Sequence, residues 1–234
     1  MRALRILYED DYLLAADKPA GFYSMPSEDK SISHSFHWDA LHILEKQKGQ
    51  RLYPAHRLDR ATSGLLLFSK QQNFNDAIQR QFREREVAKT YFCVVRGRLE
   101  GEALIESPLK NEDGAMQPAL TKATALHQFS LPIEGPRGAF RDFTFVRAHP
   151  ETGRFHQIRR HLASLSMPLV GDNQHGDRKV NRAFAEIAKT NGLILRCMGL
   201  KLKHPATGEP FELRARWSRD WHRLFDATGY CPLP

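Results

Sequence analysis

The spacing of apolar residues along the chain predicts a mixture of strands and helices. Alternating or continuous apolar runs of strand-forming residues are typical of β-strands. We expect strands in the segments 6–8, 12–16, 65–68, 87–97, 120–129, 141–147, 193–197, 200–205 and 211–215. Short turns separate the first two and the last two of these segments, so each of these pairs predicts a hairpin.

Apolar residues at intervals of three and four predict five helices, because this spacing places them on one face of a helix. We expect these helices near residues 36–48, 73–86, 158–165, 180–187 and 218–229. Gly49, Gly192 and Gly229 are typical stop signals, and Ser218 is a typical N-cap. The segment 99–139 is rich in proline and glycine, so we expect loops there around a single strand.

Composition narrows the class of protein. The 234 residues suffice for one large domain or two small ones, and we expect a single domain over residues 1–234. Lysine and arginine number 35 against 27 acidic residues, and the net charge of +8 favours a polyanionic partner. Cys93, Cys197 and Cys231 form no C-x-x-C pair, which argues against a disulfide framework or a zinc site. No apolar stretch reaches membrane-spanning length, so we expect a cytoplasmic protein.

Candidate chemistry is concentrated just before the apolar run 65–68. Asp59 lies there between Arg57 and Arg60, and a Thr-Ser-Gly turn leads from it into the predicted buried strand. A carboxylate that cations keep ionised and a rigid element aims is suited to act as a nucleophile or base. By themselves, these few residues favour the simpler interpretation of an ion-paired loop that caps a strand.

A second polar cluster opens the predicted helix 158–165. Arg154, His156 and Gln157 lie at its start, and Arg160 follows in its first turn. Because a helix N-terminus favours anions, these residues alone are consistent with any phosphate-binding helix.

The histidines do not predict a metal site. His34, His37 and His42 lack the acidic or cysteine partners of a ligand set. His156 and His161 are five residues apart, which does not match the i, i+4 spacing of a helical metal pair. We therefore expect no bound metal.

Three motifs together resemble a known enzyme family. Residues 56–67 read His-Arg-Leu-Asp-x-x-Thr-Ser-Gly-Leu-Leu-Leu, which is similar to the catalytic signature of pseudouridine synthases related to the RluA family. Residues 89–91 resemble the Lys-x-Tyr motif of this family, and residues 154–159 resemble its Arg-x-His-Gln-Ile-Arg motif. The segment 17–21 resembles the family's Asn-Lys-Pro-x-Gly, and residues 171–176 resemble its Gly-Asp-x-x-Tyr-Gly, so the resemblance covers nearly the whole chain in order.

The chain departs from the family pattern at three places. Asp17 stands where the Asn-Lys-Pro-x-Gly motif has asparagine, and His175 stands at the aromatic position of a Gly-Asp-x-x-Tyr-Gly motif. Arg196-Cys197 stands where the family usually has His-Ala. We expect the strand at 193–197 to survive that change, with altered contacts beside the active cleft. The early position of the segment 17–21 leaves no room before it for the S4 RNA-binding module of many relatives, so the basic surface should lie on the catalytic body.

The resemblance implies an enzyme that isomerises a uridine in RNA to pseudouridine. Its fold would be α/β (α+β), with a mixed, mainly antiparallel sheet flanked by helices, and it would need no cofactor. The implied roles are catalysis for Asp59, packing against the target uracil for Tyr91, and pairing with Asp59 for Arg159. The implied RNA-binding residues are Arg57, Arg60, Lys89, Arg154, His156, Gln157 and Arg160. Arg57 would fill the gap that the flipped-out base leaves in the stack.

The target RNA is the least constrained part of this interpretation. Residues 117–121 resemble the subgroup that modifies tRNA, and the overall match is nearest to the member that modifies uridine 65 of tRNA. A 23S rRNA uridine is the alternative within the family. A non-catalytic RNA-binding protein of the same fold would not need the carboxylate, and a glycosidase would need a second one or a metal. We expect a monomer, and whether Asp59 acts at C1′, at C6 or on the C2′ proton stays open.

Overall fold

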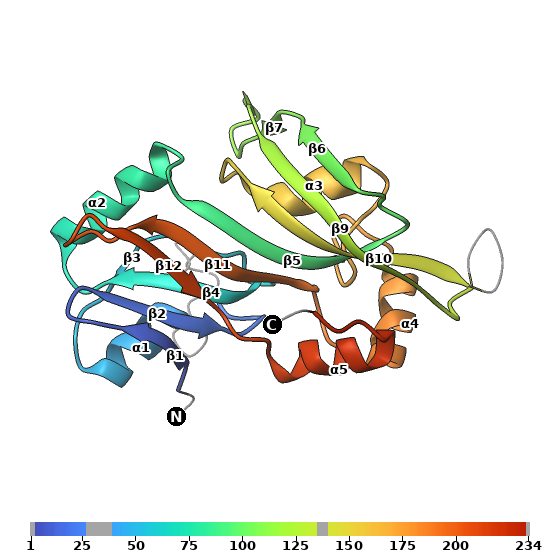
Figure 1. Cartoon of the computed structure of the whole chain (residues 1–234), viewed down its shortest axis with the longest axis horizontal. Coiled ribbons are helices and arrows are strands. Elements are labelled where there is room, and N and C mark those ends of the chain that lie inside the picture. Colours follow the sequence, from blue (N-terminus) through green and yellow to red (C-terminus); the bar gives the residue numbers. More distant parts are fainter. Residues whose placement is uncertain (1–2, 27–38, 135–139, 233–234) are drawn as a thin grey trace. The chain divides into compact units, whose positions relative to one another are not determined.

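A computed structural model describes residues 3–26, 39–134 and 140–232 (Figure 1). The chain divides into two compact units. The first comprises Met1–Lys89 and Arg196–Ala215, and the second comprises Thr90–Leu195 and Arg216–Pro234. The expected single catalytic domain over the whole chain stays a prediction.

The sheet of the first unit is built around strand β4 (Ser63–Ser69), which is buried from its second residue to its last. Strand β2 (Leu13–Lys18) pairs antiparallel with β4, and β11 (Leu195–Lys203) pairs parallel with it (Figure 1). Three further strands extend this sheet: β1 (Arg5–Glu9) beside β2, β12 (Pro210–Arg214) beside β11 and β3 (Tyr53–Pro54) beside β4. A strand with neighbours on both sides and apolar side chains on both faces is fixed firmly in place, and the residues that precede β4 inherit that rigidity.

Two helices of the first unit are tied to the ends of its strands by glutamine side chains. Gln47 of α1 (Ala40–Lys48) bonds both the N–H and the carbonyl of Leu4, just before β1. Gln81 of α2 (Gln72–Arg83) bonds both backbone groups of Lys203 at the end of β11. Each amide satisfies a donor and an acceptor that the strand ends would otherwise expose.

The second unit contains an antiparallel sheet in the order β5-β10-β9-β6. These strands are β5 (Ala88–Arg96), β10 (Arg141–Pro150), β9 (Leu120–Leu131) and β6 (Glu102–Glu106). A separate short pair is formed by β7 (Leu109–Lys110) and β8 (Met116–Gln117). The helices are α3 (Gln157–Ser164), α4 (Arg178–Ala188) and α5 (Arg219–Thr228). The core of this unit is aromatic, with the rings of Phe143 on β10 and Phe184 on α4 packed edge to face at 4.9 Å.

The predicted fold class is confirmed, since both units combine mainly antiparallel strands with helices. The expected stops at Gly49 and Gly229 are also confirmed, because each closes its helix in the left-handed conformation. Ser218 precedes α5 as expected, with no side-chain capping bond. The predicted first helix began near Phe36, which lies outside the described residues, as do His34 and His37.

Other predicted boundaries were wrong. The segments 193–197 and 200–205 form one strand, β11, because pairing with β12 carries the ladder through Gly199. Helix α4 ends at Ala188. Lys189 adopts the left-handed conformation that closes the helix, and it lies three residues before the expected stop at Gly192. Helix α2 ends at Arg83, short of the predicted 86, because the chain turns back where Arg85 adopts a positive φ of 61°.

Strands β6, β7 and β8 lie in the segment that we expected to hold one strand among loops. In β6 only Ile105 is buried, so its sequence shows little of the apolar pattern of a strand. Among the described residues, no helix is long and apolar enough to cross a membrane.

The backbone of β11 lies close against β4 at Gly64. This glycine has φ 107°, and a Cβ built there would lie 2.1 Å from the carbonyl oxygen of Cys197. The side chain would therefore collide with the backbone of a paired strand, which cannot move aside without breaking the ladder.

We expect Gly64→Ala to lower the free energy of unfolding by about 3–5 kcal/mol, because the strain of a positive φ adds to the clash. The matched control is Gly101→Ala, at φ 60° with no atom within 4 Å of its Cβ, which should cost about 1 kcal/mol. Urea titrations of both variants measure the difference. Equal midpoints would show that β11 can retreat from β4.

Candidate active site

The turn that carries Asp59 is fixed on both sides by buried hydrogen bonds. Before it, the hydroxyl of Ser24 accepts from the N–H of Leu58 at 2.8 Å and donates to the carbonyl of Leu58 at 2.9 Å. After it, the buried Thr62 donates its N–H to the carbonyl of Asp59 at 3.0 Å, and β4 begins at the next residue. The backbone of Asp59 is thus held between two satisfied anchors, while its side chain is only partly buried.

Lys18 provides a third anchor, and its buried amino group lies near Asp59. Its fully buried ammonium group donates to the carbonyls of Phe22 at 2.6 Å, Pro19 at 3.1 Å and Arg60 at 3.2 Å. Burial lowers the pKa of Lys18 to about 7, although the nearby charge of Asp59 acts to raise it. The resemblance gave Lys18 no role. Its position at the end of an apolar strand was the available signal, since a lysine there is either exposed or paired.

The two arginines that flank Asp59 are exposed. Arg60 donates from Nε to the carbonyl of Gly21 at 3.0 Å, and its guanidinium lies over the ring of Tyr23, 5.1 Å from the ring centroid. Arg57 is accessible to solvent immediately before the catalytic turn. Both are available to contact phosphate, so their predicted role in RNA binding stays a prediction that their exposure permits.

His56 has a structural place in the same loop. Its Nε2 accepts the N–H of Leu67 in β4 at 3.1 Å, and its ring stacks on Phe82. Burial lowers the pKa of His56 to about 4, which keeps the imidazole neutral and Nε2 able to accept. His56 therefore serves the strand rather than acid–base chemistry near neutral pH.

In the second unit, Arg159 forms a buried two-bond fork with Asp172. Its Nε donates to one carboxylate oxygen at 2.7 Å and its Nη2 to the other at 2.9 Å, and Nη2 also donates to Gln174 at 2.9 Å. Burial alone would raise the pKa of Asp172, but the bonds from Arg159 and from the N–H groups of Gln174 and His175 bring it below its usual range. The guanidinium of Arg159 is thereby fixed in orientation.

The sequence analysis did not identify Asp172 as a partner of Arg159. The signal available in the sequence was the Gly171-Asp172 turn. In the structure, a side chain at position 171 would collide with the carbonyl of Gly192, so the turn requires glycine there. A guanidinium carries five N–H donors, so the fork with Asp172 does not preclude a second carboxylate. The pairing of Arg159 with Asp59 stays a prediction.

Two further residues of the predicted site lie on β5. Tyr91 is buried, with 9 % of its surface exposed, and lies opposite Ala148 of β10. Lys89 lies two residues earlier, and burial lowers its pKa to about 8. Packing of Tyr91 on a uracil and contact of Lys89 with RNA stay predictions.

Gln157 is buried, and its amide holds the turn before α3. Its Oε1 accepts from the hydroxyl of Thr152 at 2.6 Å and from the N–H of Arg154 at 3.0 Å. Its Nε2 donates to the carbonyl of Leu120 at 2.9 Å and to the hydroxyl of Thr121 at 3.0 Å. The geometry shows that Gln157 supports the turn before α3. Contact of Gln157 with RNA stays a prediction.

The start of α3 also presents an aromatic surface that the sequence analysis missed. Phe155 is 51 % exposed, and its ring stacks on that of His156 with centroids 3.8 Å apart. Arg154 donates to the carbonyl of Pro118 at 3.2 Å, and Arg160 donates to the carbonyl of Lys110 at 2.9 Å. These bonds hold two basic side chains beside an open aromatic face, which suits contact with an unpaired base and its phosphates.

Among the described residues, no three histidine, cysteine or acidic side chains are grouped so as to hold a metal ion. His161 instead bonds the hydroxyl of Thr121 at 3.0 Å and the carbonyl of Ser107 at 2.9 Å.

We expect Arg159→Ala to lower the free energy of unfolding by about 3–5 kcal/mol, because it leaves the carboxylate of Asp172 buried without a counter-charge. Arg160→Ala is the matched control on the same helix, and it should cost less than about 1 kcal/mol since its guanidinium is partly exposed. Thermal and urea unfolding measure both. If the two variants were equally stable, the fork would not be a structural support.

Comparison with known proteins places these observations in one family. The model of the RNA pseudouridylate synthase family matches residues 12–164. The tRNA pseudouridine synthase C of Yersinia pestis is 35 % identical over 97 % of this chain and 91 % of its own length. That of Vibrio cholerae is also 35 % identical, over 97 % of this chain and 96 % of its own length.

Solved structures share the fold. Human RNA Pseudouridylate Synthase Domain Containing 4 superposes with a TM-score of 0.69 at 21 % identity, covering 94 % of this chain and 92 % of that one. Human RNA Pseudouridylate Synthase Domain Containing 1 has the same TM-score and identity, with coverage of 99 % and 96 %. Fold, motifs and sequence identity agree, and the chain belongs to the RNA pseudouridylate synthase family.

Proposed function

We propose that this protein converts a uridine of tRNA, at position 65, to pseudouridine, with Asp59 as the catalytic carboxylate. The observation that carries the proposal is the rigid Asp59 turn, held by Ser24, Lys18 and Thr62 at the entry of a buried strand. The tRNA target is supported by relatives named tRNA pseudouridine synthase C at 35 % identity.

The reaction defines what such a site must supply. The bond between N1 of uracil and C1′ of ribose breaks, the base rotates, and C5 bonds to C1′ while the proton on C5 is lost and N1 gains one. Atoms and electrons balance without an external group, so the isomerisation requires no redox partner. It requires one ionised carboxylate, and we assign this role to Asp59, which acts at C1′, at C6 or on the C2′ proton.

Two residues complete the proposed chemistry. Arg159, already fixed by Asp172, supplies a counter-charge that favours the ionised form of the catalytic carboxylate. Tyr91 offers an aromatic ring against which the detached uracil stacks while it rotates.

RNA affinity is proposed to come from exposed or partly exposed basic residues on the same chain. Arg57, Arg60, Arg154 and Arg160 would contact phosphates, with Phe155 stacking on a base beside them. The target uridine lies within folded RNA and must be flipped out to reach the carboxylate. We propose that the protein acts in the cytoplasm as a monomer.

The test of the proposal is incubation of the purified protein with two unmodified RNA samples, followed by mapping of pseudouridine. One sample is a full set of tRNA transcripts, and the other is a 23S rRNA transcript. Modification of tRNA at position 65 is the expected result. Modification confined to 23S rRNA would move the protein to the rRNA branch of the family. Binding of RNA without any pseudouridine would favour a non-catalytic RNA-binding protein.

We expect Asp59→Asn to reduce the turnover of tRNA by at least about 10²-fold, because the isosteric amide cannot carry the negative charge. RNA affinity and thermal stability should stay close to the parent, since the turn is held by its backbone. Asp11→Asn, at an exposed position of the same unit, is the matched control and should be fully active. Retained activity in pure Asp59→Asn protein would remove Asp59 from the mechanism.

Tyr91→Ala should weaken tRNA binding by roughly 1–3 kcal/mol, the usual contribution of one aromatic ring stacked on a base. Tyr91→Phe keeps the ring and should keep the affinity, so any loss of rate in that variant reports on the hydroxyl. Equilibrium binding and single-turnover kinetics separate the two effects. Parental binding by folded Tyr91→Ala protein would contradict the stacking role.

A further inference from the structure

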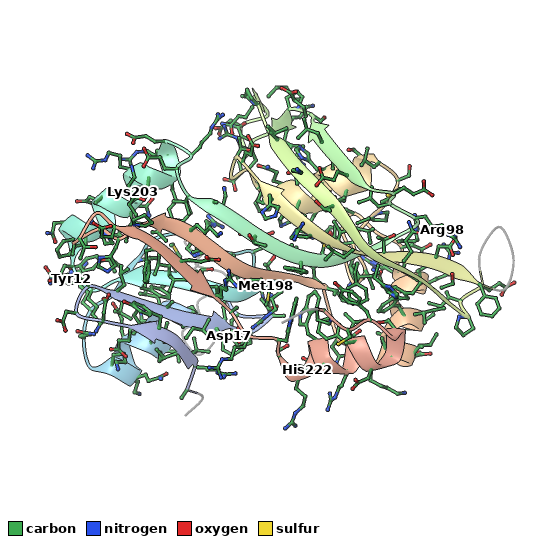
Figure 2. The ribbon with its side chains drawn as sticks, viewed as in Figure 1. Tyr12, Asp17, Arg98, Met198, Lys203 and His222 are labelled. Carbon is green, nitrogen blue, oxygen red and sulfur yellow. The ribbon has the colours of Figure 1, made fainter. Side chains whose placement is uncertain are left out.

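A buried ion pair joins two strands of the first unit that are not neighbours in its sheet. Nη2 of Arg196 on β11 lies 2.7 Å from Oδ2 of Asp17 on β2. The side chains are 2 % and 15 % exposed, and Arg196 is among the largest fully buried side chains of the described chain. Figure 2 labels Asp17 on β2 and, two residues beyond Arg196 on β11, Met198.

The register explains how the two side chains meet. Asp17 lies opposite Leu65 of β4, and Arg196 lies opposite Ser63. Residues opposite each other on paired strands point to the same face, as do residues two apart on one strand. Asp17 and Arg196 therefore share a face and meet diagonally across the first three residues of β4. Strands are spaced about 4.8 Å apart, and a long arginine side chain can reach across two such spacings.

This part of β4 is directly connected to the catalytic turn. Ser63 follows Thr62, whose N–H closes the turn by bonding to the carbonyl of Asp59. The next residue of each strand points to the other face, where Lys18 of β2 and Cys197 of β11 lie opposite Gly64. Any shift of β2 or β11 along β4 would therefore move the start of β4 and, through it, the backbone of Asp59.

The pair is poorly explained as a device for stability alone. Replacing a buried ion pair with apolar residues of similar volume is often neutral or stabilising, so such a pair is weak support for a fold. It does impose one register, because an arginine that loses its carboxylate is left charged in a buried place. Asp17 and Arg196 are also two of the positions where the sequence departs from the family pattern, and this contact joins them.

We propose that Asp17 and Arg196 are positioning residues for the reaction, a coupled pair that fixes the start of β4 and with it the orientation of Asp59. The pair acts through the backbone of the Asp59 turn and takes no part in the chemistry. The kinetic test of this inference rests on the proposed function, and the exchange test described below does not.

The kinetic test compares Asp17→Asn, Arg196→Gln and the double variant with the parent on the tRNA transcript. In each single variant kcat should fall by roughly 10- to 100-fold, because a small displacement of a catalytic group is enough for such a loss. KM and the dissociation constant for tRNA should not change. The double variant leaves no buried charge without a partner, so it should recover most of the lost kcat.

Glu212→Gln is the matched control. Glu212 on β12 forms an exposed ion pair at 3.5 Å with Lys201, which lies on β11 as Arg196 does. Loss of this ion pair should leave kcat unchanged. Equal kcat for parent and folded single variants would overturn the proposal, even if their melting temperatures fall. Weaker tRNA binding, or no recovery in the double variant, would do so as well, since the residues would then act on RNA or independently of each other.

Amide hydrogen exchange tests the same coupling without any substrate. The N–H of Thr62 should exchange roughly tenfold or more faster in Asp17→Asn than in the parent, and should regain protection in the double variant. If a single variant does not fold, the double variant provides the test. The proposed positioning role requires the N–H of Thr62 to be as protected in the double variant as in the parent. Protection that is the same in folded Asp17→Asn and parent would overturn the inference. If the parent makes no pseudouridine but these exchange rates differ as expected, the proposed function fails and the coupling of the Asp17–Arg196 pair to the Asp59 turn stands.

Discussion

The rest of this structure depends on one constraint, the need to hold a partly solvated carboxylate in a fixed place at the entry of a buried strand. Strand β4 meets this need because it has paired neighbours on both sides and apolar side chains on both faces. Such a strand has a single register, and its first residue therefore has a single position. Asp59 lies one tight turn before that residue. The rigidity of the core is therefore passed directly to Asp59, the proposed catalytic group.

Prediction from sequence succeeded where one signal dominated and failed where neighbouring strands decided the outcome. The run 65–68 is apolar throughout, so its burial followed from composition alone. Strand β11 was split in two because a Met-Gly pair interrupts its apolar pattern, whereas pairing with β12 supplies hydrogen bonds through that point. Strand β6 was missed because only one of its five side chains is buried, and pairing with β9 holds it in place.

The candidate site shows the same division. Asp59 and Arg159 stand in long motifs with chemically distinctive side chains, so the sequence could point to them. The bonds that support them could not be predicted, because they join residues that no periodicity connects. Gln157 is an example: its amide sits in the same motif as Arg159, yet only the fold shows that it faces inward and bonds Leu120 and Thr121. Motifs identify which side chains are candidates for the site, and the fold shows which of them bond to the protein itself.

A net charge of +8 consequently overstates the capacity of this chain to contact RNA. Lys18, Arg159 and Arg196 are buried and bonded to protein oxygen atoms, so they release no counterions when RNA binds. Their charges act inside the protein, where a low dielectric makes each ion pair strong and each unpaired charge costly. On the proposed function, the exposed Arg57 and Arg60 attract phosphates at long range, an effect that salt screens. The proposal therefore gives the two populations of cations different roles: the exposed one attracts the RNA, and the buried one holds the strands and turns of the site in register.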